Sequence, residues 1–182
     1  MTTVMYSVKD ETLGTTRDRF PSGMADIPKT YARIERSIDM TDSEMADAPG
    51  KTWMEIVRKN GTAEFAAAFA AAVVVEASVL NGAGRGIDFV RAFFRGTSGM
   101  YERIGFTYEM GDAVKTYLEW EGEAFGMPVS GSTTLTRNAA GLIESIRLHH
   151  RPLSMVVRFS AELGRRLHGQ VDPALFDQGF PQ

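Results

Sequence analysis

Apolar and polar residues alternate along the second half of the chain, from Ile104 onward. A period of two is typical of strands that bury one face and expose the other. Turn-forming residues interrupt the alternation at 110–112, 126–128 and 138–141. Strands this close in sequence pair antiparallel, so the pattern predicts a four-stranded meander made of FTYEM, VKTYLEWEGEAF, VSGSTTLTR and LIESIRLHHR.

Helical spacing precedes this meander. Trp53, Ile56 and Val57 predict a first helix, which Asn60-Gly61 would end because these residues tolerate a left-handed conformation. The alanine-rich segment AEFAAAFAAA predicts a second, buried helix. The β-branched run VVVEASVL then predicts a strand over 73–80, and IDFVRAFF predicts a short helix.

A closing helix follows the meander. Pro152 ends the last strand, and LSMVVRFSAELGRRLHG returns to helical spacing until Gly169. Helices on one side of a meander predict an α+β domain in which the helices cover one face of a curved sheet.

Length and composition limit the organisation and the partners. The 182 residues, 43% of them apolar, predict one domain over 45–169, an N-terminal extension over 1–44 and a tail over 170–182. A net charge of −3 argues against a nucleic-acid surface, and the chain has no cysteine for disulfides or thiolate ligands. The N-terminus lacks the layout of a signal peptide, and the longest apolar run, 65–75, is too short for a membrane helix. We therefore expect a cytoplasmic protein without nucleic-acid or membrane partners.

The loop NGAGRG lies between an expected strand and an expected helix, as dinucleotide-binding loops do. Its spacing is G-x-G-x-G rather than G-x-G-x-x-G, and an antiparallel meander follows instead of a second parallel strand. We interpret it as a tight or flexible loop and expect no nucleotide cofactor.

His149 and His150 stand side by side at the end of the last expected strand. Adjacent residues of a strand point to opposite faces, so the two imidazoles cannot reach one metal ion unless a bulge intervenes. Since only His168 remains as a further histidine, we expect no metal site.

Alternation indicates which side chains face the helices. On the last strand His150 shares the more apolar face, so it should point inward and His149 outward. The same rule turns Trp120 inward, and it turns Phe106, Tyr108 and Met110 inward with Glu109 outward. Tyr108, Trp120, Thr133 and His150 would then add polar tips to an apolar cavity, a composition typical of small-molecule pockets. Ordinary core packing of the same aromatic residues is the alternative.

Three segments, VVVEASVLNGAGRGIDFV, LEWEGEAFGMPVSGSTTLTRNAAGLIESI and HHRPLSMVVRF, resemble the SnoaL-like branch of the nuclear transport factor 2-like superfamily. The resemblance covers about residues 45 to 169. It implies a cone: a curved mixed β-sheet wrapped around N-terminal helices, with a C-terminal helix and an apolar pocket. Members include polyketide cyclases, ketosteroid isomerases, dehydratases, epoxide hydrolases and proteins that only bind ligands or partners.

The resemblance also assigns positions to the catalytic residues of the isomerases. Their carboxylate base falls on Ala77, their protonated acid on Thr133 and their tyrosine near Met54. None of these residues can play the expected role, and the aspartate of the cyclases has no counterpart because 113–151 contains no Asp. His150 is then the best candidate acid or base, since its ordinary pKa lies near neutrality. We expect Tyr108, Trp120, Thr133 and Ala77 to contact the ligand.

Two functions are compatible with these residues. One is a cofactor-independent isomerase, cyclase, dehydratase or hydrolase that acts on a small, largely apolar metabolite. The other is a ligand-binding or dimerisation module without chemistry. A homodimer is expected because Tyr117, Phe125 and Ile143 would place apolar surface on the outer side of the sheet.

Overall fold

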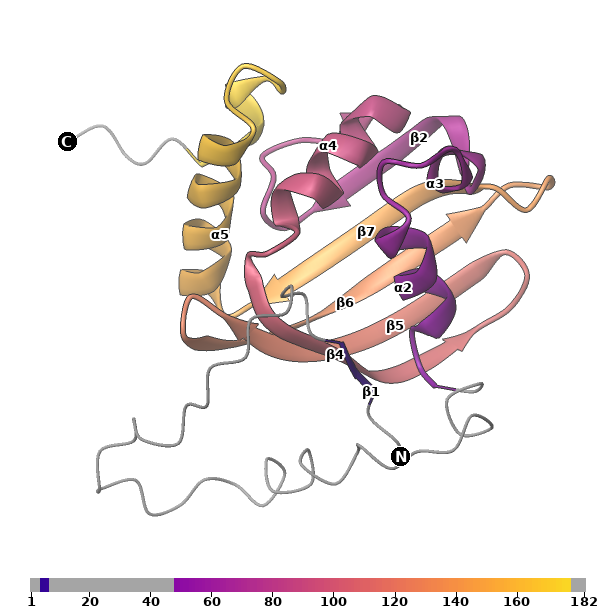
Figure 1. Ribbon diagram of the computed structural model, residues 1–182, viewed down its shortest axis with the longest axis horizontal. Helices are drawn as coiled ribbons and strands as arrows, with labels where there is room; N and C mark the ends of the chain where they lie inside the picture. Colours follow the sequence, from indigo (N-terminus) through magenta and orange to yellow (C-terminus); the bar gives the residue numbers. More distant parts are fainter. Residues whose placement is uncertain (1–3, 7–47, 178–182) are drawn as a thin grey trace, which may run out of the picture.

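A computed structural model describes residues 4–6 and 48–177. Seven strands form one curved sheet in the order β1-β4-β5-β6-β7-β2-β3. The helices are α2 (Lys51–Arg58), α3 (Ala63–Ala67), α4 (Ile87–Thr97), α5 (Leu153–Arg166) and the short 3₁₀ helix η2 (Pro173–Leu175). Figure 1 shows the helices on the inner side of the sheet, which curves around them. The expected α+β architecture with a curved mixed sheet and a C-terminal helix is confirmed.

The meander is confirmed as four long antiparallel strands, β4 (Tyr101–Gly111), β5 (Lys115–Ala124), β6 (Met127–Arg137) and β7 (Ile143–Arg151). The sheet is mixed because β2 (Phe69–Ala77) pairs parallel with β7 and antiparallel with the two-residue β3 (Gly84–Arg85). The strand expected over 73–80 thus begins earlier and ends earlier.

The second expected helix is mostly wrong. Helix α3 stops at Ala67, and the alanines that follow belong to β2. Phe69 pairs with Ile143, and the Ile143 amide donates to the Ala68 carbonyl at 2.9 Å. Pairing with β7 therefore overrides the helix propensity of alanine, which is a weak preference.

A β-bulge in β4 corrects the expected orientation of Tyr108. The register shifts between Phe106 and Tyr108, so Phe106 pairs with Trp120 whereas Tyr108 pairs with Glu119. Because a bulge inserts one residue, the side chains beyond it change face. Tyr108 is half-buried beside Met110, which is 54% exposed. Glu109, expected outward, instead accepts a hydrogen bond from the Gly50 amide at 2.7 Å.

A second register shift changes the outer face of the sheet. It lies between Thr136 and Arg137 of β6, and it leaves Ile143 only 1% exposed rather than outward. Phe125 is also half-buried, with its ring 6.1 Å from that of Phe159. Of the three apolar residues expected on the outer face, only Tyr117 remains there, and the homodimer stays a prediction.

The described ends of the chain pack onto this domain. β1 (Val4–Tyr6), within the expected extension 1–44, pairs antiparallel with β4, and the rest of that extension lies outside the described residues. Beyond the expected boundary at 169, Phe176 is 1% exposed and belongs to the core. No helix in the described part of the chain has the length and apolarity needed to cross a membrane.

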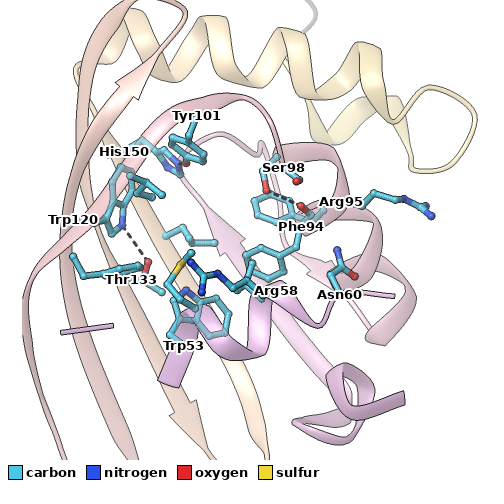
Figure 2. Close-up of a pocket in the computed structure, with 17 residues that line it drawn as sticks. Trp53, Arg58, Asn60, Phe94, Arg95, Ser98, Tyr101, Trp120, Thr133 and His150 are labelled. Atoms are coloured by element: carbon cyan, nitrogen blue, oxygen red, sulfur yellow. Dashed lines mark hydrogen bonds between the residues drawn. The ribbon is translucent and has the colours of Figure 1, made fainter. Parts of the chain in front are cut away.

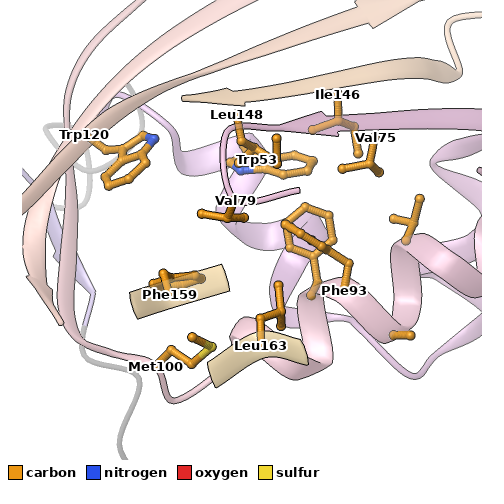
Figure 3. Packing of buried hydrophobic residues seen from close by; sticks show 14 of the residues in the cluster. Trp53, Val75, Val79, Phe93, Met100, Trp120, Ile146, Leu148, Phe159 and Leu163 are labelled. Carbon is orange, nitrogen blue, oxygen red and sulfur yellow. The ribbon is translucent and has the colours of Figure 1, made fainter. Parts of the chain in front are cut away.

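The core lies between the sheet and the helices. Figure 3 shows Val75 and Ile146 of the sheet facing Phe93 of α4 and Leu163 of α5 across it. The closing helix buries Met155, Phe159 and Leu163, whereas Leu153 at its start is exposed. This packing fixes α4 and α5 against one end of the sheet and leaves a cavity beside α2.

Candidate functional site

A cavity of about 480 Å³ lies between α2, α4 and the inner face of the sheet. Helix α2 contributes Trp53 and Met54, α4 contributes Phe93 and Phe94, and the sheet contributes Phe106. These side chains make the wall mainly apolar. Figure 2 shows the polar groups gathered in two places, with His150, Tyr101 and Thr133 toward the sheet and Asn60, Ser98 and Arg95 near the helices.

The sheet register brings two aromatic rings together at one end of the cavity. Gly131 of β6 pairs with Trp120 on one side and with His150 on the other. The rings of Trp120 and His150 meet edge to face over this glycine, with centroids 5.0 Å apart. A Cβ atom at position 131 would lie 2.4 Å from the Trp120 ring and 2.0 Å from the His149 carbonyl oxygen. Only glycine lets the two rings approach in this way.

His150 is bonded through its ring to Tyr101, the first residue of β4. The Tyr101 hydroxyl oxygen lies 2.7 Å from His150 Nε2, and both residues line the cavity. Phe159 of α5 covers the pair, with its ring centroid 5.2 Å from each of theirs. His150 is therefore 8% exposed.

The positions of the oxygen and nitrogen atoms favour one arrangement of protons. A separation of 2.7 Å is typical of an O–H donor, since N–H donors usually lie at about 2.9–3.0 Å. Tyr101 then donates to Nε2, and the proton on Nδ1 faces the Ser78 hydroxyl at 3.5 Å. Ser78 also accepts the His150 backbone N–H at 2.9 Å. In this arrangement the Tyr101 oxygen can only accept a hydrogen bond from a ligand. With the opposite tautomer of His150, Nε2–H donates to Tyr101 and the phenol O–H is left to donate to a ligand.

Burial keeps both rings neutral. Desolvation, and to a smaller extent the neighbouring His149, lowers the pKa of His150 from 6.5 to about 4. Burial also raises the pKa of the Tyr101 phenol well above its ordinary value. The pair therefore offers a neutral hydrogen-bonding oxygen at neutral pH, and a positive charge on His150 is strongly disfavoured.

Trp120 and Thr133 form the second polar contact at this end. The Trp120 indole N–H donates to the Thr133 hydroxyl at 3.2 Å, and both side chains are buried. This bond satisfies the indole without a ligand and fixes the ring that forms part of the cavity wall.

The structure brings together three of the five residues expected at the site. His150, Trp120 and Thr133 line the cavity, as alternation predicts. Tyr108 does not line it, because the bulge in β4 turns its side chain away. Ala77 is buried in the core but does not line the cavity either. Glu76 points outward and pairs with Arg147 at 2.6 Å, so it does not replace the missing carboxylate.

Sequence reasoning missed Tyr101. The expected strand began after Ile104, and a register shift between Tyr101 and Arg103 separates Tyr101 from the alternation that follows. The tyrosine lies just after the turn that closes α4, and nothing local shows that its side chain reaches His150. The Met54 position, reached through the family resemblance, does line the cavity.

None of the described residues that line the cavity carries a carboxylate. Among these described residues there is also no group of three or more His, Asp or Glu side chains that could hold a metal ion. The polar chemistry of this cavity, as far as the structure describes it, comes from hydroxyls, amides, arginines and one neutral imidazole.

Solved structures share this architecture. An uncharacterized bacterial protein with a cystatin-like fold from Silicibacter pomeroyi is 21% identical, with a TM-score of 0.59 over 64% of this chain and 82% of its own. A steroid delta-isomerase from Pseudomonas aeruginosa is 15% identical, with a TM-score of 0.58 over 72% of this chain and 96% of its own. The chain has the nuclear transport factor 2-like fold. No family model matches the sequence, and no curated protein matches it.

The nuclear transport factor 2-like fold explains where the cavity lies, at the inner face of the curved sheet under the helices. At these identities the likeness concerns the fold. One such fold supports many activities, so the function has to be argued from the cavity itself.

Proposed function

We propose that this protein binds a small, largely apolar metabolite in the cavity, with an oxygen atom of the ligand against the Tyr101 hydroxyl. The observation that carries the proposal is the 2.7 Å contact between Tyr101 and His150 at the wall of an apolar cavity of about 480 Å³. A volume of this order suits a compact ligand with one or two polar groups.

The same pair supports cofactor-independent isomerase, cyclase or dehydratase chemistry. With the other tautomer of His150, the Ser78 hydroxyl donates to Nδ1 and Nε2–H donates to the phenol oxygen. Tyr101 would then donate its own proton to the ligand oxygen, and His150 behind it would hold the phenol in place. A direct proton transfer to His150 is less favourable, because Tyr101 occupies Nε2 and the pKa of His150 is lowered to about 4. The carboxylate-base mechanism of the ketosteroid isomerases is not supported, since Ala77 stands at the base position.

Binding without chemistry is the second candidate. It is favoured by the way in which the polar groups at the sheet satisfy one another, Trp120 with Thr133 and Tyr101 with His150. Because these polar groups are already hydrogen-bonded to one another, they can shape a binding cavity without taking part in a reaction.

Two measurements on one ketone separate the two candidates: its binding to the protein, and the exchange of the protons next to its carbonyl group with solvent. Intrinsic tryptophan fluorescence would follow binding of 2-decalone and of decalin, its hydrocarbon counterpart, to the wild type and to Tyr101→Phe. We expect 2-decalone to bind more tightly than decalin, and the difference to be lost in Tyr101→Phe. NMR in D₂O would follow exchange of the protons next to the carbonyl. Exchange that depends on Tyr101 supports an enzyme, binding without exchange supports a binding module, and equal weak responses to both compounds would contradict the proposal.

A further inference from the structure

The polar residues at the helical side of the cavity differ in charge from those at the sheet. The sheet side presents neutral groups, with Tyr101, Thr133 and a His150 that stays uncharged. The helical side presents Arg58 and Arg95, both exposed, together with the exposed Ser98 and the half-buried Asn60. Exposure identifies this side as the opening of the cavity.

The two arginines at the opening are oriented differently. Arg58 is the last residue of α2, and Figure 2 shows its side chain extending toward the cavity near Trp53. The Arg95 side chain extends away from the cavity, and its guanidinium donates to the Gln170 side chain at 2.9 Å. Arg58 is therefore the arginine placed to meet a ligand.

The described residues of the cavity wall carry charge of one sign, which is positive. None of the described lining residues is acidic, so an anion entering the cavity meets no described carboxylate on its wall. A guanidinium matches a carboxylate with two parallel N–H donors, and its five donors allow it to hold an anion in addition to another contact.

We infer that the ligand is amphipathic and anionic: an apolar body fills the cavity, and a carboxylate lies at the opening against Arg58. This inference rests on the proposed function only in taking the cavity as the ligand site. It adds the charge and the orientation of the ligand, with the anion toward the helices and the body toward Trp120.

A matched pair of probes tests the charge. 4-Cyclohexylbutanoate and 4-cyclohexylbutan-1-ol share one apolar body and differ in the terminal group. The chain has two tryptophans, Trp53 and Trp120, and both line the cavity, so their fluorescence reports occupancy directly. We expect the carboxylate to bind the wild type about 10- to 100-fold more tightly than the alcohol, which is the range for charge-assisted hydrogen bonds.

Arginine variants test the residue. Arg58→Met keeps an apolar side chain beside Trp53 and should weaken carboxylate binding about 10-fold or more. Its affinity for the alcohol should stay within about twofold of the wild-type value. Arg58→Lys keeps the charge but loses the planar fork, so its affinity should be intermediate. Arg95→Met is the matched control: it removes the same charge from a side chain that points away, and it should leave the preference for the carboxylate intact.

The outcomes separate this inference from the proposed function. If both probes bind equally and Arg58→Met changes neither affinity, the anionic ligand is refuted while the cavity remains a binding site. If Arg95→Met has the same effect as Arg58→Met, diffuse charge and not Arg58 determines binding, and the inference fails. If neither probe changes the fluorescence or the thermal midpoint, the cavity does not bind such bodies, and both proposals fail.

Discussion

Trp120 and His150 lie two strands apart, and their rings meet edge to face above Gly131 with centroids 5.0 Å apart. This relationship places the imidazole against the cavity wall and directs its Nε2 toward Tyr101. The contact between the two rings depends on Gly131, which lies between them on β6 and has no side chain. A larger residue at this position should therefore disturb both the core packing and the cavity.

Gly131→Ala should lower the free energy of unfolding by about 1–3 kcal/mol, the usual cost of overpacking a core. The added Cβ atom would meet the His149 carbonyl oxygen, a backbone atom that cannot turn aside. Urea denaturation measures the change. Gly82→Ala is the control, because its Cβ atom would meet only the end of the Leu175 side chain, at 3.3 Å. Equal stability of Gly131→Ala and wild type would show that the two rings do not pack over Gly131.

The lowered pKa of His150 makes stability depend on pH. In the unfolded chain the imidazole gains a proton near pH 6.5, whereas in the folded protein it does so only near pH 4. The unfolded state therefore binds more protons within this window, so stability is fully present above about pH 6.5 and decreases as the pH falls toward 4. The loss amounts to about 3 kcal/mol.

Urea unfolding at several pH values, together with NMR titration of the imidazole, checks this dependence. His150→Leu should remove most of the loss in the upper part of that window, above the range where carboxyls titrate. His149→Gln should retain most of it, because the exposed His149 contributes only the smaller part of the shift. A His150 that titrates near 6.5 in the folded protein would contradict the expectation.

Thr133→Val should destabilise the fold by about 1–3 kcal/mol, because it leaves the buried Trp120 indole N–H without an acceptor. Valine has nearly the shape of threonine, so loss of packing contributes little. Chemical denaturation measures the cost, and the same change at the half-exposed Thr134 is the control. In Trp120→Phe, which has no indole donor, Thr133→Val should cost clearly less. A cost that does not depend on the indole would refute this coupling.

Glu109→Ala should lower stability by about 0.5–2 kcal/mol, the range for loss of a side-chain cap at a helix N-terminus. Its carboxylate accepts the Gly50 amide at 2.7 Å, and Gly50 is the N-cap residue of α2. Because α2 forms one wall of the cavity, binding of an apolar probe should weaken as well. Glu121→Ala, on the exposed side of β5, should change neither quantity. Unchanged stability in Glu109→Ala would mean that this bond does not hold the helix.

The sequence by itself determined the meander and the inward direction of Trp120, Thr133 and His150. Alternation between apolar and polar residues is local, and it predicts the correct face wherever two strands pair without a break. Leu118, Trp120 and Ala124 of β5 are buried for this reason, in a strand whose pairing with β6 is regular.

Only the tertiary structure decided the positions of Tyr101, Tyr108 and Ile143. Each lies next to a register shift, and a shift arises from how two distant strands pair, so the pattern within one strand does not contain it. The same holds for the start of β2, where pairing with β7 replaced a helix. Whether the inward aromatic residues close on one another or leave a cavity also depends on where the core fixes α2 and α4 against the sheet. The local sequence pattern does not predict where these two helices pack, because their positions depend on contacts between distant segments.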